Sequence, residues 1–159
     1  MSDYQVMADG LKALLINKAP GSTYIKAANI SSKSNWDLLN EGQNPLVIIT
    51  PGAAPRDESE GALTDYYAMD WHMDVHCISR YIGPMPNVHD LLINVADAVQ
   101  QTVDQWPGLN GVAGVEKAVH MGWIAPNELF PLSGGGPHAI EMIVPVVVTA
   151  GVTYTAQED

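Results

Sequence analysis

The segment from Met69 to Cys77 alternates strictly between apolar and polar residues. The apolar set is Met69, Trp71, Met73, Val75 and Cys77, and the polar set is Asp70, His72, Asp74 and His76. Because successive side chains of an extended chain point to opposite faces, the pattern predicts a strand with one buried face and one polar face. The polar face has three possible uses: a metal site, a contact with a partner, or a surface in water.

Hydrophobic spacing predicts the other elements of one domain over residues 1–153, followed by a polar tail over 154–159. Helices are expected over Asp3–Lys18 and from Asn87 to Trp106, where Pro107 and Gly108 end the second. Strands are expected over Thr23–Ile30, Leu46–Thr50, Tyr66–Arg80, Val115–Ile124 and Ala139–Thr153. This order, α-β-β-(long loop)-β-α-β-β, predicts an α+β fold with a mixed or antiparallel sheet and two helices packed on one face.

Three segments between these elements carry their own expectations. Pro51–Thr64 is rich in Pro, Gly, Ala and acidic residues, so we predict a long mobile loop. Pro126–Gly136 is expected to be a flexible turn. Pro145 cannot donate a ladder hydrogen bond, so it should fall at a sheet edge or a bulge.

The charge balance excludes some functions. The chain has 18 acidic and 7 basic residues, a formal net charge of −11. Such a surface repels nucleic acid phosphates and anionic lipid, although it would let DNA pass without sticking. No secretory signal and no apolar stretch long enough to span a bilayer is visible, which predicts a protein made in the cytoplasm. The single cysteine, Cys77, is expected to be a buried small hydrophobe rather than a catalytic thiol.

A metal site on the polar strand face is a possible alternative, because imidazole and carboxylate are good metal ligands. His72 and His76 would lie about 13 Å apart at about 3.3 Å per residue, too far to share one ion. His72 and Asp74 could share one only with a further ligand, for which His120 and His138 are candidates. We therefore favour a polar face or a subunit contact, with no metal.

The sequence contains no affirmative signature of an enzyme and none of a cofactor site. No Gly-x-Ser-x-Gly elbow is present. Gly134, Gly135 and Gly136 lack the lysine and the following Ser or Thr of a phosphate-binding loop. What remains is an acidic domain with open sheet edges, which assembly into a ring would cover.

The order of these elements resembles the tail terminator family of long-tailed bacteriophages, a group of minor tail proteins. The resemblance is carried by the helix Asp3–Lys18, the strand Leu46–Thr50, the long loop into Tyr66–Val75, the helix that begins at Val88 and the strand Ile140–Thr153. It implies a ring of copies of the chain, expected to be a hexamer, at the head-proximal end of the tail tube in the virion. Such a ring stops tube polymerisation, contacts the tube protein and a neck or head-completion protein, and lets DNA through.

On that resemblance, Asp57, Glu58 and Glu60 are expected to face the lumen or the neighbouring subunit. Asp70, His72, Asp74 and His76 are expected at a subunit contact. The family shares no functional residue that could be carried over, so both assignments rest on position and charge. The alternatives are a head–tail joining protein of the phage neck, whose sheet-and-helix design is similar, and a metal-binding enzyme or module that uses His72 and Asp74.

Overall fold

A computed structural model gives the fold for residues 3–19, 28–30, 45–60, 66–80, 85–129 and 139–153. Its helices are α1 (Asp3–Lys18) and α2 (Met85–Gln105). Its strands are β1 (Ala28–Ile30), β2 (Leu46–Glu60), β3 (Tyr66–Arg80), β4 (Val115–His120), β5 (Ile124–Leu129) and β6 (Ala139–Thr153). The predicted bounds of α1, β3 and β6 are confirmed, and the α+β class with them.

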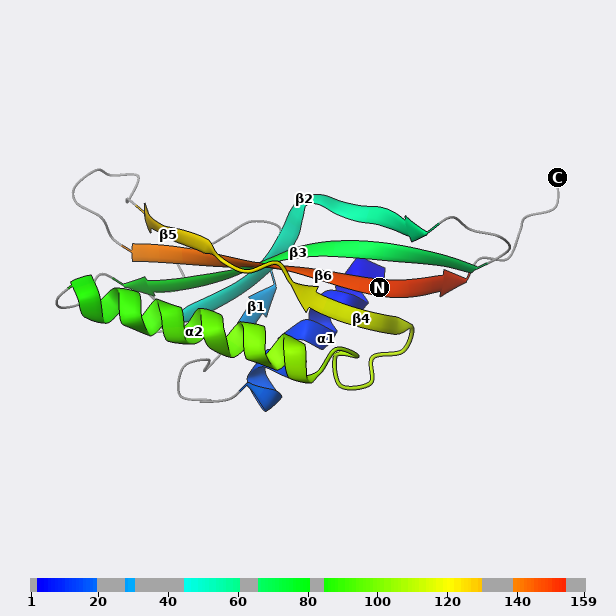
Figure 1. Ribbon diagram of the computed structural model, residues 1–159, viewed down its shortest axis with the longest axis horizontal. Helices are drawn as coiled ribbons and strands as arrows, with labels where there is room; N and C mark the ends of the chain where they lie inside the picture. The colour runs from blue at the N-terminus through cyan, green and yellow to red at the C-terminus, as the bar shows by residue number, and fades with distance from the viewer. Residues whose placement is uncertain are drawn as a thin grey trace.

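The strands form one strongly twisted mixed sheet in the order β1-β2-β3-β6-β4, and β5 also pairs with β6 (Figure 1). Among the described strands, β1 and β2 are parallel and the other pairs are antiparallel. The two longest neighbours, β3 and β6, pair without a break from Tyr66↔Thr153 to Arg80↔Ala139. This ladder forms the centre of the sheet.

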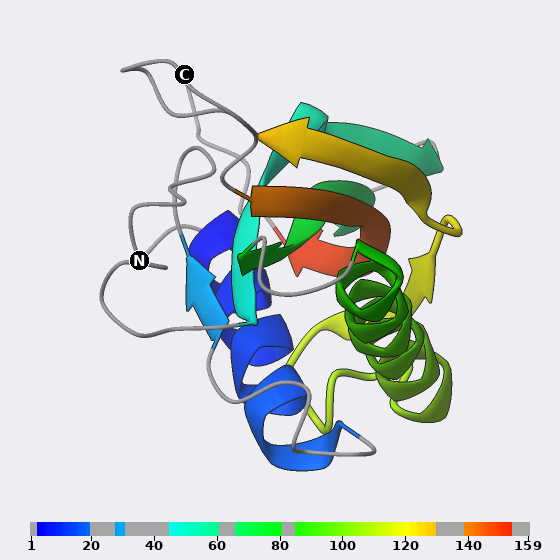
Figure 2. The same cartoon turned by 90° about the vertical axis from the view of Figure 1, so that its left-hand side faces the viewer.

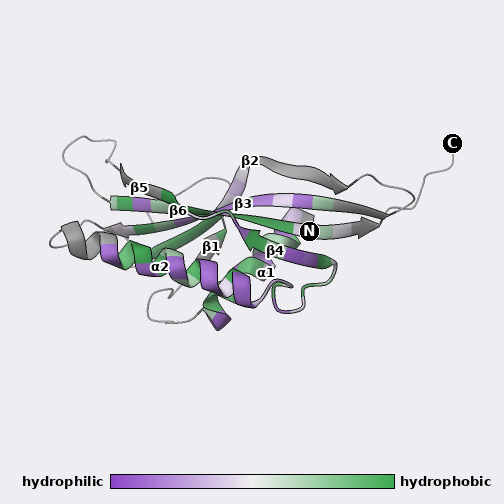
Figure 3. Cartoon of the chain, in the orientation of Figure 1, coloured by the Kyte–Doolittle hydropathy of each residue, from purple (hydrophilic) through white to green (hydrophobic). Residues whose placement is uncertain are grey.

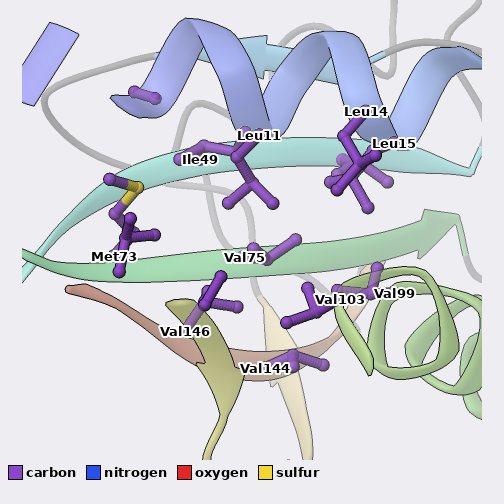
Figure 4. Packing of buried hydrophobic residues seen from close by; sticks show 14 of the residues in the cluster. Leu11, Leu14, Leu15, Ile49, Met73, Val75, Val99, Val103, Val144 and Val146 are labelled. Carbon is purple, nitrogen blue, oxygen red and sulfur yellow. The ribbon is translucent and has the colours of Figure 1, made fainter. Parts of the chain in front are cut away.

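Both helices lie on the same face of the sheet, as predicted, which is clearest when the molecule is viewed from its end (Figure 2). Leu11, Leu14 and Leu15 of α1 lie over Ile49 and Val75 of the sheet (Figure 4). The apolar set predicted for the alternating strand belongs to this core: Met69, Trp71, Met73, Val75 and Cys77. Burial of so much apolar surface is the main stabilising term of the fold.

The amphipathic pattern of α2 explains how it packs. Its hydrophobic and hydrophilic residues recur in stripes along the helix (Figure 3). Val95, Val99 and Val103 are fully buried, and Leu91 and Trp106 pack against the same cluster. This is the stripe that helical spacing predicted. The helix ends at Gln105, directly before Trp106, Pro107 and Gly108.

The predicted mobile loop over Pro51–Thr64 is wrong for residues 51–60, because β2 continues to Glu60 (residues 61–64 lie outside the described part). Arg56 pairs with Trp71, Asp57 with Asp70 and Glu58 with Met69. The register shifts twice, between Pro51 and Arg56, where four residues lie opposite His72, and between Glu58 and Glu60. The long partner strand supplies the pairing that the local composition disfavours.

The predicted strand Val115–Ile124 is in fact two strands. β4 leaves β6 at His120↔Val146, and β5 resumes pairing at Ile124↔Ile143. Residues 126–129 of the expected turn therefore belong to β5. Pro145 lies in a central strand rather than at an edge, but it faces the interruption between β4 and β5, so its missing N–H removes no bond from the β3 ladder.

The remaining short elements agree with expectation where they can be compared. Of the strand expected over Thr23–Ile30, residues 28–30 form β1, and residues 23–27 lie outside the described part.

Gly10 lets α1 approach the chain that follows α2, because a Cβ there would lie 2.6 Å from Cγ2 of Val112. A larger residue at this position would push the two segments apart.

Candidate assembly surface

The face of the sheet opposite the helices carries the polar residues singled out in the sequence. Residues 70, 72, 74 and 76 of β3 are each partly exposed and alternate with buried neighbours. They lie beside the residues of β6 that are opposite them in register: Thr149, Val147, Pro145 and Ile143. We call this side of the sheet the outer face. Its buried cluster consists, among the described residues, of strand residues: Leu46, Ile48, Ile78 and Ala139.

His76 is at the centre of a hydrogen-bonded group that joins three strands. Its Nδ1 lies 3.0 Å from Oε2 of Glu141 on β6, and its Nε2 lies 2.8 Å from Oγ1 of Thr50 on β2. An ionised carboxylate only accepts, so Nδ1–H donates to Glu141, and a neutral ring then accepts at Nε2 from the Thr50 hydroxyl. Thr50 and Glu141 are both buried.

The hydroxyl–imidazole–carboxylate order of this group is the order found in nucleophilic catalysis. A nucleophile must also reach a substrate, and only 4% of the Thr50 surface is exposed, in the middle of a strand. The group is therefore a structural tie. It holds β2, β3 and β6 together and satisfies three polar side chains in a largely apolar region.

Asp70 and Asp74 have different surroundings on the same face. The Thr149 hydroxyl donates to Oδ1 of Asp70 over 2.6 Å, across a directly opposed pair of β3 and β6. Burial raises the pKa of the Asp74 carboxyl, His76 and His72 lower it, and Glu141 raises it again, with a net upward result. Asp74 therefore favours its neutral form more than an exposed aspartate does.

The charge of Asp74 also affects Tyr4 of α1. Burial, followed by the charge of Asp74, raises the pKa of the Tyr4 phenol to about 12. Its hydroxyl is buried and has no hydrogen-bond partner among the described residues. An unsatisfied buried hydroxyl destabilises the folded state.

The other candidate ligands and nucleophiles in the described part of the chain are separated or buried, and His138 lies outside that part. Nε2 of His120 lies 3.2 Å from Oδ2 of Asp104. Nδ1 of the same ring accepts a hydrogen bond from the N–H of Gly122, so His120 fixes the turn after β4. Within the described residues, no three His, Cys, Asp or Glu side chains are placed to hold a metal ion. Cys77 is buried, as predicted, and burial followed by Glu141 raises the pKa of its thiol to about 12.

Two sheet edges are open. Within the described residues, β2 pairs with β1 only at Val47–Ile49, so its second half, Pro51–Glu60, pairs with β3 alone. On the other side of the sheet, β4 and β5 pair with β6 and with no other described strand. Asp57, Glu58 and Glu60 therefore belong to an edge strand, on the opposite side of β3 and β6 from β4 (Figure 1).

Sequence reasoning missed Thr50 and Glu141 as the partners of His76. Glu141 carried a signal, because it is the only charged residue in the fifteen residues of β6. A lone carboxylate in an apolar strand must find a hydrogen-bond donor when it is buried. No comparable signal pointed to Thr50.

No family model and no curated protein matches the chain, whereas chains of solved structures do. Among solved structures, a chain described as "Virion of native gene transfer agent (GTA) particle" is similar, with a TM-score of 0.47 and 11% identity. The match covers 94% of this chain and 91% of that chain. No described helix is both long and apolar enough to cross a membrane.

Proposed function

We propose that this chain is a structural protein of a phage-type virion whose copies join head to tail in a ring, expected to be a hexamer. The observation that carries the proposal is the pair of open edges on opposite sides of one sheet, β2 beyond Thr50 and β4–β5. An exposed edge is a template for another strand. When the two edges differ, pairing is head to tail and closes into a ring if the rotation per copy allows it.

The place of the ring follows from the resemblance in the order of elements, as a proposal. The ring would cap the head-proximal end of the tail tube, end its polymerisation and contact the neck. The net charge of −11 suits this place, since an acidic wall repels the DNA duplex and lets it slide. The chain would be a non-enzymatic protein, because the triad-like group of Thr50, His76 and Glu141 in the described part of the chain is inaccessible.

The test uses purified tail tubes that lack their terminal ring. We expect the protein to bind one end of each tube as a six-fold ring in negative-stain images and to stop further addition of tube protein. Tube protein alone is the control, and purified heads test the neck connector as the other outcome. Binding to heads but not to tubes would overturn the terminator role, and a protein that ignores both would overturn the virion role.

A further inference from the structure

An exposed apolar cluster lies where β4 gives way to β5. The described residues include seven large exposed hydrophobic side chains, and four of them lie between residues 119 and 124. These four are Val119 at 39%, Met121 at 66%, Trp123 at 44% and Ile124 at 54% exposure. The other three, Val6, Ile16 and Ile93, are on helices. A concentration of this kind marks a contact surface, whereas single exposed apolar residues do not.

The cluster continues onto the outer face of the sheet. Val119 is directly opposite Val147, and Ile124 is directly opposite Ile143. Both β6 residues are partly exposed, and Pro145 lies between them on the same face. Directly opposed residues share a face, so the apolar surface spans β4, β5 and β6. Trp is also one of the residue types enriched at the energetic centre of interfaces.

Charge distribution identifies the kind of partner. Between Ala118 and Gln157, only Glu128 and Glu141 are charged, although the whole chain has a net charge of −11. Two copies with so much like charge repel each other over most of their surfaces. Residues 119–124 include no Asp, Glu, Lys or Arg, and the Asp104 carboxylate beside them is hydrogen-bonded to His120, so a second acidic copy meets less repulsion here than at the acidic parts of the surface.

The second half of β2 is the complementary surface on that copy. It is an open edge on the other side of the same sheet, and its sequence contains Asp57, Glu58 and Glu60. The β4 edge offers an exposed basic residue, Lys117, next to Glu116 in a bulge. An acidic edge strand is thus matched by a charge-poor, apolar edge.

We infer that residues Val119–Ile124 form the anchor between neighbouring copies, and that the second half of β2 of the next copy docks against them. The inference rests on the proposed ring and identifies its interface. Trp123 and Ile124 form the buried centre of the contact. The two open backbone edges determine how the neighbouring copies are oriented. The contact is head to tail, because the two surfaces differ.

The first test is the double substitution Trp123→Ser with Ile124→Ser. We expect the concentration at half-assembly to rise at least tenfold by mass photometry, both in solution and on tube ends. The matched control is Ile93→Ser, an exposed apolar residue at 37% on α2, which should assemble as the parent does. Thermal melting followed by circular dichroism checks that each variant folds.

The second test places cysteines on the two surfaces. Val119→Cys is made in one preparation, and Asp57→Cys, Glu58→Cys or Ser59→Cys in another, while the native Cys77 is buried and silent. Head-to-tail contact predicts a disulfide between mixed preparations and none within either alone. Cross-linking of Val119→Cys copies only to themselves would overturn the docking of β2.

Three results separate this inference from the proposed function. Rings that persist in the Trp123→Ser, Ile124→Ser variant would overturn the anchor but leave the ring intact. A protein that caps tubes as a monomer would overturn the anchor and the ring but leave the capping role. A protein that neither assembles nor binds virion parts would overturn both.

Discussion

The backbone N–H of Met121 donates a hydrogen bond to the carbonyl of Pro145 over 2.8 Å. Six residues further along β6, the N–H of Gly151 donates to the carbonyl of Gly114 over 2.8 Å, so the odd-numbered residues of β6 direct their backbone groups toward β4. Pro145 has no N–H to offer on that side. The edge strand is interrupted there, which leaves Met121, Gly122 and Trp123 between β4 and β5.

Replacing Glu141 should destabilise the fold, because His76 would lose the acceptor for its Nδ1–H. We expect Glu141→Ala to reduce the free energy of unfolding by about 1–3 kcal/mol, the usual effect of leaving a buried polar group unsatisfied. Glu141→Gln keeps an acceptor and should lose less. Urea denaturation measures both, with Asp97→Asn on the exposed face of α2 as the control. Equal stability of Glu141→Ala and the parent would refute the structural tie.

The strands of the sheet show how far the sequence could predict the fold. The alternation of β3 predicted its bounds and faces, since one strand carries its own periodicity. It could not show that β2 extends to Glu60, because the residues 51–60 have poor strand propensity and their pairing comes from Trp71, Asp70 and Met69. It could not place the break after His120 either, since the cause is Pro145, distant in sequence. Long-range pairing decided each of these points.

Asp74 should make the fold less stable as the pH rises. Its pKa is raised in the folded state, so the folded chain binds the proton more tightly than the unfolded chain. The favourable contribution is complete below the unfolded value of about 3.9 and is lost as the pH rises through the folded pKa. We therefore expect Asp74→Asn to be more stable than the parent at pH 7. Unfolding curves at pH 3.5, 5 and 7 test this, and a stability gap that does not widen with pH would contradict it.

Tyr4→Phe should leave stability unchanged or raise it at pH 7. The hydroxyl is buried without a partner among the described residues, so its removal costs no hydrogen bond there. The pKa of the Tyr4 phenol is raised to about 12 in the folded chain. The protonated phenol therefore contributes stability that is complete below a pH of about 10 and is lost as the pH rises to 12. The variant should therefore resist alkaline unfolding better than the parent. Tyrosine absorbance during a pH titration measures the phenol, and a loss of more than about 1 kcal/mol at pH 7 would reveal a missed partner.

Cys77 should not react with thiol reagents in the folded protein. Burial and Glu141 raise the pKa of the thiol to about 12, so almost no thiolate exists at pH 8. We expect no labelling by a chromogenic disulfide reagent in buffer and one labelled thiol per chain in 8 M urea. Cys77→Ser should destabilise by about 1–3 kcal/mol, because it buries a hydroxyl in the core. Rapid labelling without denaturant would show that the core opens near β3.

The proline in β6 also fixes how the two longest strands can slide past each other. A slip of one residue would rotate β6 about its axis, so that Pro145 would face β3 without a donor and Glu141 would turn toward the helices. Both changes are unfavourable, since the ladder would lose a bond and a carboxylate would enter the core. Pro145 thereby fixes the register of β3 and β6, so that every copy offers its neighbours the same alignment of edges.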